Sequence, residues 1–230
     1  MDLFYSKKTC IYHSGSFMKA SIYYLPVLLF FLSACSSSQR LHSWKAASYP
    51  TRHFQKVLVL GFLREEDNSM RENIENQVAD ELNKKNINTV TSLQLLGTKV
   101  FARMDEDDAL YQLNNQCVDA VLTVTVLNRS REKKYTAGVI HYTPYGYSYD
   151  RFWRYKTAIK YRISSEDYYA SGEDYFLECN LYDMTTQQLV YSVQSRHALL
   201  EEFEKEGNKF IQKIVRAIVK KGVLENPKSR

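Results

Sequence analysis

The sequence predicts one α/β (α+β) domain over residues 53–222, with helices packed on a single mixed β-sheet. Three observations lead to this prediction. Apolar strand-like runs alternate with amphipathic helical patterns in the first half of the chain, two strand patterns flank a tight turn in the second half, and a long amphipathic helix closes the domain. Short connections from strand to helix to strand favour parallel pairing, whereas the tight turn favours an antiparallel hairpin.

The composition fits one domain and excludes several other classes of protein. The chain has 230 residues, and 44% of them are hydrophobic, which is too many for a disordered chain. A mean hydropathy of −0.43 excludes a membrane protein with several spans. Four cysteines are too few for a disulfide scaffold. The net charge is +5 for the whole chain and +3 without residues 1–34, which is too small to indicate a nucleic-acid partner.

The first predicted elements are a strand and a helix. The apolar run from Lys56 to Phe62 is typical of a strand that is buried on both faces. Ser69 and Glu72 have the spacing of a helix capping box. Apolar residues then recur at every fourth position, as expected for an amphipathic helix: Met70, Ile74, Val78 and Leu82. This helix should stop at Asn86, and a short strand should follow over residues 87–91.

A second helix and a further strand complete the first half of the domain. The acidic run at residues 105–108 places negative charge where the positive end of a helix dipole favours it. The buried face of this helix is expected to carry Leu110, Leu113 and Cys117. The apolar run at residues 119–127 predicts another buried strand.

The second half of the domain is predicted to be antiparallel. Apolar and basic residues alternate over residues 153–163, which predicts a strand with one buried face and one basic, solvated face. Residues 175–181 and 189–195 should form a hairpin around a turn at 183–187. The closing helix should run from 199 to 221 and end at Gly222, before a tail over residues 223–230.

The amino-terminal segment is predicted to be a targeting signal. Met18 and Lys19 precede an apolar run that ends at Ala34 and is shorter than the roughly 20 residues that span a bilayer. Residues 18–34 therefore fit a signal peptide, and residues 1–17 are a misplaced start or an extended leader. The alternative is a buried apolar helix that happens to end in a cysteine.

The end of this segment resembles the lipobox of bacterial lipoproteins: Leu32, Ser33, Ala34 and Cys35. The resemblance implies cleavage before Cys35, diacylglycerol on its thiol and a further acyl chain such as palmitate on the new amino terminus. Residues 35–52 would then be the lipidated cysteine and a polar tether. Ser36 at the next position favours the outer membrane, with the domain facing the periplasm.

The predicted hairpin at residues 181–192 resembles one that recurs in small envelope proteins. The groups that it resembles are the curli-secretion lipoprotein, the penicillin-binding-protein activator lipoproteins and the TolB amino-terminal domain. Gln187 stands where these proteins usually have a turn glycine, and Tyr191 stands where they usually have tryptophan. The resemblance implies a periplasmic module without catalytic activity.

Two groups of residues are candidate binding surfaces. An aromatic segment interrupted by glycine and proline is a candidate partner-binding loop: Tyr142, Tyr145, Tyr147, Tyr149, Phe152 and Trp153. Its alternative is a hairpin extension whose rings pack on their own sheet. A basic stripe is a candidate face for anionic headgroups or cell-wall polymer: Arg154, Lys156, Lys160 and Arg162. Its alternative is a solvated face balanced by cross-strand acids such as Glu178.

No catalytic motif, cofactor motif or metal-ligand spacing is found, so we expect no enzyme, no cofactor and no metal site. Cys117 and Cys179 are predicted to be small buried hydrophobes, with a periplasmic disulfide as the alternative. The predicted function is that of a membrane-anchored lipoprotein that binds or scaffolds an envelope protein or cell-wall component. The alternative is a subunit of an outer-membrane secretion or assembly complex of the curli-channel type, which a stable ring in detergent would reveal.

Overall fold

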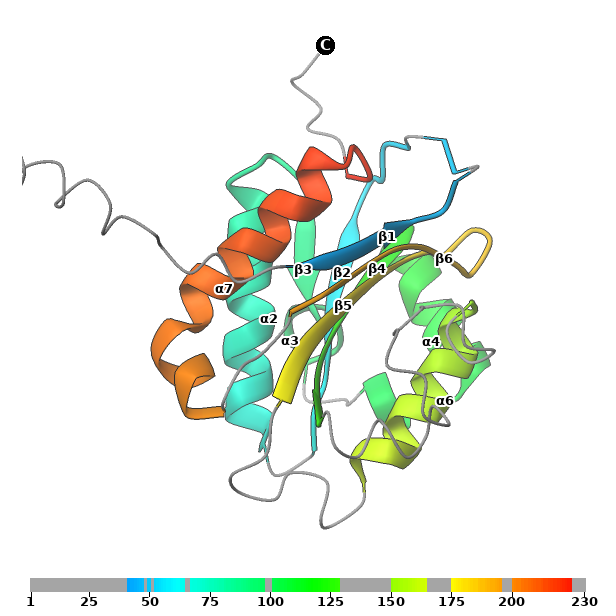
Figure 1. The fold of residues 1–230 in the computed structure, drawn as a ribbon. Helices are drawn as coiled ribbons and strands as arrows, with labels where there is room; N and C mark the ends of the chain where they lie inside the picture. Colours follow the sequence, from blue (N-terminus) through cyan, green and yellow to red (C-terminus); the bar gives the residue numbers. More distant parts are fainter. Residues whose placement is uncertain are drawn as a thin grey trace, which may run out of the picture. The chain divides into compact units, whose positions relative to one another are not determined.

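The computed structural model describes residues 41–47, 49–50, 52–64, 67–97, 101–128, 150–164, 175–195 and 200–224. These residues form three layers, with a β-sheet between two pairs of helices (Figure 1). Helices α2 (Asn68–Asn83) and α7 (Leu200–Lys220) cover one face of the sheet. Helices α4 (Glu106–Asn115) and α6 (Phe152–Ile163) cover the other face.

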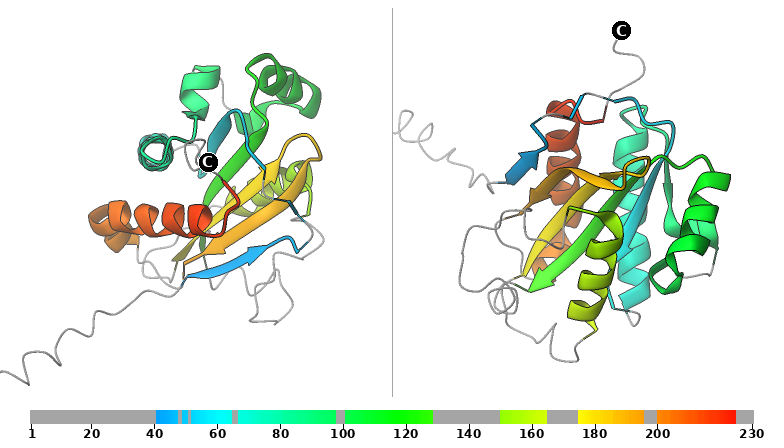
Figure 2. Two further views of the ribbon diagram at one scale, coloured as in Figure 1. Left: turned by 90° about the horizontal axis from the view of Figure 1, so that it is seen from above. Right: turned by 90° about the vertical axis from the view of Figure 1, so that its right-hand side faces the viewer.

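The sheet has six strands in the order β1-β6-β5-β4-β2-β3. In chain order, they are β1 (His42–Lys45), β2 (Val57–Phe62), β3 (Thr89–Thr91), β4 (Ala120–Asn128), β5 (Tyr175–Asp183) and β6 (Gln188–Gln194). Strand β2 pairs in parallel with β3 and with β4, and every other pairing is antiparallel. The predicted α/β class, the mixed sheet, the hairpin and the long closing helix are confirmed, and Figure 2 shows the twist of the sheet from two further directions.

The sheet separates two apolar cores. Val57 and Val59 of β2 face the core under α2 and α7, whereas the intervening Leu58 and Leu60 face the core under α4 and α6. All four side chains are at most 1% exposed, which confirms a strand buried on both faces. The apolar positions predicted for α2 also lie against the first core, with Met70 at its margin.

Helices α2 and α4 both end in the hydrogen-bond pattern of a Schellman motif. In α2, Ile87 N–H donates to the Leu82 carbonyl, and Asn86 has a φ of 59°. In α4, Val118 N–H donates to the Leu113 carbonyl, and Cys117 has a φ of 55°. The chain therefore leaves α4 before Cys117 reaches the core.

The prediction that Cys117 is a buried residue was wrong for this reason. Cys117 is exposed at the end of α4, whereas Cys179 is buried on the core face of β5 as predicted. Both are free cysteines, so the structure has no disulfide between them and does not support that alternative.

Residues 153–163 form most of α6 and not a strand, so this prediction was also wrong. Tyr155, Ile159 and Ile163 recur at every fourth residue and pack into the second core. The local alternation from Trp153 to Lys156 fits a strand, but over the whole segment the helical spacing buries more apolar surface.

The segment assigned to a polar tether contains a strand of the sheet. Strand β1 pairs with β6 from His42 opposite Gln194 to Lys45 opposite Tyr191, and the amine of Lys45 donates to the Lys221 carbonyl at 3.2 Å. The folded unit therefore begins before residue 53. Hydrophobic patterning missed β1 because its four residues are polar or aromatic and none is fully buried.

The capping box lies elsewhere than predicted. Helix α2 begins after Asp67 without a side-chain cap, whereas the short helix α3 (Ser92–Leu96) has a complete box. In that box, Thr91 accepts from the backbone of Gln94, and the Gln94 side chain accepts from the backbone of Thr91. Among the described residues, no helix has the length and apolar character needed to cross a membrane.

Gln187 occupies a left-handed backbone conformation, with a φ of 58°, in the turn of the β5–β6 hairpin. We expect Gln187→Gly to raise the free energy of unfolding by about 0.5–1 kcal/mol, because glycine adopts positive φ without a steric cost. The backbone bond from Phe152 N–H to the Gln187 carbonyl remains available. Urea denaturation measures the change. The matched control, Gln188→Gly in β6, should lower stability, and a loss of stability in Gln187→Gly would contradict the argument.

Candidate functional site

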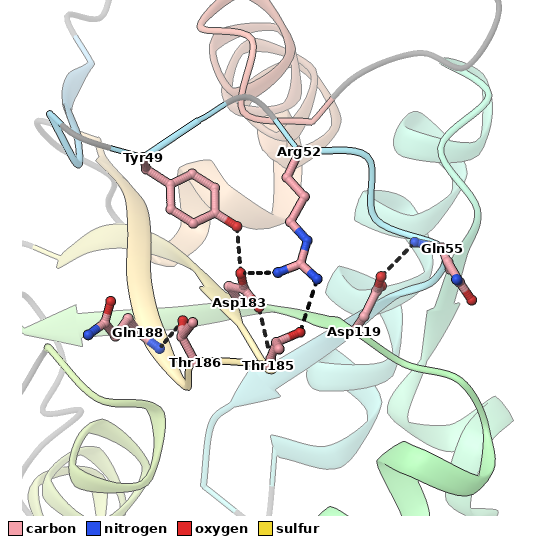
Figure 3. Close-up of polar contacts among 8 residues, drawn as sticks. All are labelled: Tyr49, Arg52, Gln55, Asp119, Asp183, Thr185, Thr186 and Gln188. Carbon is pink, nitrogen blue, oxygen red and sulfur yellow. Dashed lines mark hydrogen bonds and ion pairs between the residues drawn. The ribbon is translucent and has the colours of Figure 1, made fainter.

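The turn of the β5–β6 hairpin is held to the segment before β2 by a cluster of polar side chains (Figure 3). One oxygen of the Asp183 carboxylate accepts from the Tyr49 hydroxyl at 2.7 Å and from the Arg52 guanidinium at 2.6 Å. Its other oxygen accepts from Thr185 N–H at 2.8 Å, and Arg52 also donates to the Thr185 hydroxyl. We call Tyr49, Arg52, Asp183 and Thr185 the turn clasp.

The hydrogen bonds and the ion pair of the turn clasp hold the hairpin turn in place. Burial alone would raise the pKa of Asp183, but the bonds from Tyr49 and Thr185 and the charge of Arg52 hold its pKa below the ordinary value. Burial and the neighbouring carboxylate raise the pKa of Tyr49. A carboxylate that binds protons weakly and already accepts three hydrogen bonds is poorly suited to remove a proton from a substrate.

Asp119 makes a second connection beside the turn clasp. Its carboxylate accepts from the backbone N–H groups of Gln55 and Lys56 at 2.9 and 3.1 Å. Its carbonyl accepts from Met184 N–H at 2.9 Å. Asp119 therefore joins the starts of β2 and β4 to the hairpin turn, and Figure 3 shows it on the side of Arg52 away from Tyr49.

A cationic groove lies on the other side of the sheet, between α6 and the segment that leads into α4. Its volume is about 510 Å³. Four charged side chains line it: Arg103, Asp105, Lys156 and Lys160. Three further side chains supply hydroxyl groups: Thr157, Tyr161 and Ser164. Arg103 belongs to a short 3-10 helix, η2 (Phe101–Arg103), and Asp105 is the N-cap of α4.

Lys156 is fixed at the inner side of the groove. Its amine donates to the Met104 carbonyl, and it lies 5.6 Å from the centre of the Phe101 ring and 5.3 Å from the Trp153 ring. These contacts hold the ammonium against aromatic faces, which attract cations. Burial, followed by the nearby charge of Lys160, lowers the pKa of Lys156. The carboxylates of Asp105 and Glu106 oppose this shift.

The structure divides the predicted basic stripe between different faces of α6. Lys156 and Lys160, four residues apart, line the cationic groove. Arg154 lies elsewhere and forms an i,i+4 ion pair with Asp150 at 3.4 Å, and Arg162 is outside the groove lining. Arg103 was missed because it lies 51 residues before Arg154, the first residue of the stripe, and no sequence pattern links the two.

Glu178 is not on a solvated face opposite the basic stripe, as the alternative expected. It is fully buried under α6, where it accepts from the Tyr155 hydroxyl at 3.0 Å. It also accepts from the amides of Asn180 and Gln194 at 2.8 and 2.7 Å. Glu178 therefore belongs to a polar network inside the second core.

Most residues of the predicted aromatic loop lie outside the described residues: Tyr142, Tyr145, Tyr147 and Tyr149. Phe152 is fully buried and packs edge-on against Phe101 and Tyr182, so its assignment as an exposed contact residue was wrong. Trp153 is half-buried and stacks on Phe101. The lipobox residues, including Cys35, also lie outside the described residues. Within the described residues, no three His, Cys, Asp or Glu side chains are grouped so as to hold a metal ion.

No protein-family model matches the chain, and no curated protein matches it. The solved structures that resemble it include two crystal forms of the PelC dodecamer from Paraburkholderia phytofirmans. A variant of that protein is 12% identical, with a TM-score of 0.40 over 77% of this chain and 95% of the PelC chain. The second form is 13% identical, with a TM-score of 0.39 over 76% and 94% of the two chains. A likeness this distant carries no inference about function.

Proposed function

We propose that this protein is a non-catalytic lipoprotein, anchored to the outer membrane through Cys35, that binds or scaffolds another component of the cell envelope. The observation that carries the proposal is the Leu-Ser-Ala-Cys sequence directly after a basic and apolar leader. A leader of this kind supplies the export signal, and the cysteine supplies the thiol for acylation.

The position of β1 supports a role close to the membrane. Only six residues separate Cys35 from His42, the first residue of β1. At about 3.5 Å per extended residue, the chain between the two reaches at most about 25 Å. A domain anchored in this way acts on components at or near the membrane surface.

The described domain offers a binding surface and no recognisable catalytic group. The turn clasp uses its carboxylate internally, whereas the cationic groove presents charged and hydroxyl groups in a cavity of about 510 Å³. Pockets of 300–1,000 Å³ are typical of small-ligand sites. Binding of an envelope component is therefore the activity that the geometry supports best.

Replacing Cys35 tests the anchor. We expect Cys35→Ala to move the protein out of the membrane fraction and to abolish the mass increase of the lipid chains, because the acylated thiol is lost. Intact-mass analysis and fractionation of a Gram-negative expression host measure both effects. The control is Cys117→Ser, which changes an exposed cysteine in the folded domain and should leave lipidation intact. An unlipidated wild-type protein would overturn the proposal.

A further inference from the structure

We infer that the cationic groove binds a phosphorylated hexose, with the phosphomonoester against Arg103, Lys156 and Lys160 and the sugar ring against Tyr161. The inference deepens the proposed function because it names the class of ligand. It does not depend on the lipid anchor, since the groove belongs to the folded domain alone.

The charges of the groove favour an anion. Three cationic side chains line it against one lining carboxylate, that of Asp105, and the charge of Glu106 beside it also acts on Lys156. That carboxylate already accepts from Asp108 N–H at 2.8 Å as the cap of α4. Lys160, one helical turn from Lys156, contributes to the lowered pKa of Lys156 through its charge, and a bound anion between the two offsets this effect.

A phosphomonoester matches this set of cations better than a single carboxylate does. It carries a charge of about −1.5 to −2 at pH 7 and has three strong acceptor oxygens. Arg103 provides a planar donor group that suits phosphate geometry, and the two lysines provide point charges. Lys156 is held in place before binding by the Met104 carbonyl and two aromatic rings, so little side-chain entropy is lost when the ligand arrives.

The remainder of the groove suits a sugar. Tyr161 lines the groove and is 76% exposed, so its ring is accessible for stacking on the C–H side of a hexose. Thr157 supplies a hydroxyl group that can donate to or accept from a sugar hydroxyl, whereas the Ser164 hydroxyl donates to the Tyr161 carbonyl at 2.9 Å and is suited to accept from a sugar hydroxyl. The volume of about 510 Å³ accommodates one or two sugar units.

Calorimetry on the full-length protein in detergent tests the inference with four soluble probes: hexose 6-phosphate, unmodified hexose, inorganic phosphate and hexuronate. We expect hexose 6-phosphate to bind at least tenfold more tightly than each of the others. A fifth probe, a phosphorylated hexosamine disaccharide, distinguishes two sources of the ligand. If the natural ligand is a glycolipid headgroup, the disaccharide should bind more tightly than hexose 6-phosphate. If it is a free sugar phosphate, the disaccharide should not bind more tightly. Equal affinity for inorganic phosphate or for hexuronate, or no binding of hexose 6-phosphate, would overturn the inference.

Two variants assign the binding to this groove. Lys160→Gln should weaken hexose 6-phosphate at least fivefold, because it removes an exposed cation from the lining. Tyr161→Ala should bring the affinity for hexose 6-phosphate close to that for inorganic phosphate. The matched control is Lys85→Gln, which removes an exposed lysine beyond the end of α2 and should leave binding unchanged. Equal weakening by Lys160→Gln and Lys85→Gln would show a general charge effect and would overturn the assignment. Lipidation of Cys35 is measured separately, so failure of the anchor and failure of the groove are distinguishable.

Discussion

Asp183→Ala is expected to lower the free energy of unfolding by about 2–4 kcal/mol, because it removes the acceptor at the centre of the turn clasp. The Asp183 side chain is 1% exposed and accepts from Tyr49, Arg52 and Thr185. The Arg52 side chain is 40% exposed, so solvent screens part of its contribution, and most of the loss comes from the other two bonds. Urea denaturation measures the change.

Asp80→Ala is the matched control for this variant, because Asp80 is exposed on α2 and its removal should change stability by less than about 0.5 kcal/mol. A loss in Asp183→Ala no larger than that in the control would show that the turn clasp does not stabilise the fold.

The turn clasp also predicts the direction of a pH effect. Because the pKa of Asp183 is lower in the folded protein than in the unfolded chain, the unfolded chain takes up the proton first as the pH falls. The stabilisation that ionised Asp183 contributes is complete above the ordinary aspartate pKa of about 4. It is lost as the pH falls through the lower pKa that Asp183 has in the folded protein. Asp183→Asn should therefore lose less stability in acid than the wild type does.

Glu75→Ala is expected to lower the free energy of unfolding by about 3 kcal/mol, because it leaves buried backbone donors without an acceptor. The fully buried Glu75 carboxylate of α2 accepts from Gly61 N–H at 2.8 Å and from Ser92 N–H at 2.9 Å. It also accepts from the Ser92 hydroxyl. These bonds join α2 to strand β2 and to the start of α3.

Glu75→Gln should lose less than Glu75→Ala, because its amide oxygen still accepts one backbone N–H group. Glu72→Ala on the same helix is the control and should change stability by less than about 1 kcal/mol, since Glu72 is only half-buried. Equal stability of Glu75→Ala and the control in urea denaturation would contradict the prediction.

The pH effect of Glu75 has the opposite sign to that of Asp183. Burial raises the pKa of Glu75 above its ordinary value, despite the bonds from Gly61 and Ser92. The folded protein therefore holds the proton to higher pH than the unfolded chain, and stability falls as the pH rises from the ordinary glutamate pKa of about 4.3 through the raised value. This part of the pH dependence should be absent in Glu75→Gln.

Apolar periodicity predicted the layers of the fold because burial of apolar surface determines them. The alternating faces of β2 and the stripes of α2 and α7 follow directly from residue spacing. The same signal failed where two periods overlap, as in α6, where the pattern around Trp153 fits a strand although Tyr155, Ile159 and Ile163 fit a helix. It also failed at β1, which is stabilised by pairing with β6.

The candidate sites were harder to predict because long-range polar contacts leave no periodic pattern. Tyr49 and Asp183 are 134 residues apart in sequence, and Lys156 and Met104 are 52 apart. Local polar motifs can be recognised in the sequence, since Thr91 and Gln94 have capping-box spacing. The basic residues of α6 were identified, but only the helix geometry separates Lys156 and Lys160 from Arg154.

The pairing of β1 with β6 determines the order in which the domain would yield to mechanical load. If Cys35 anchors the chain as proposed, tension along the backbone reaches β1 first, then Tyr49 and Arg52, and only afterwards β2. Edge strand β1 has four paired residues and can detach while Tyr49 and Arg52 remain hydrogen-bonded to Asp183. Tension applied at Cys35 would then add the four residues of β1 to the extended chain and pass next, through Tyr49 and Arg52, to Asp183 at the end of β5.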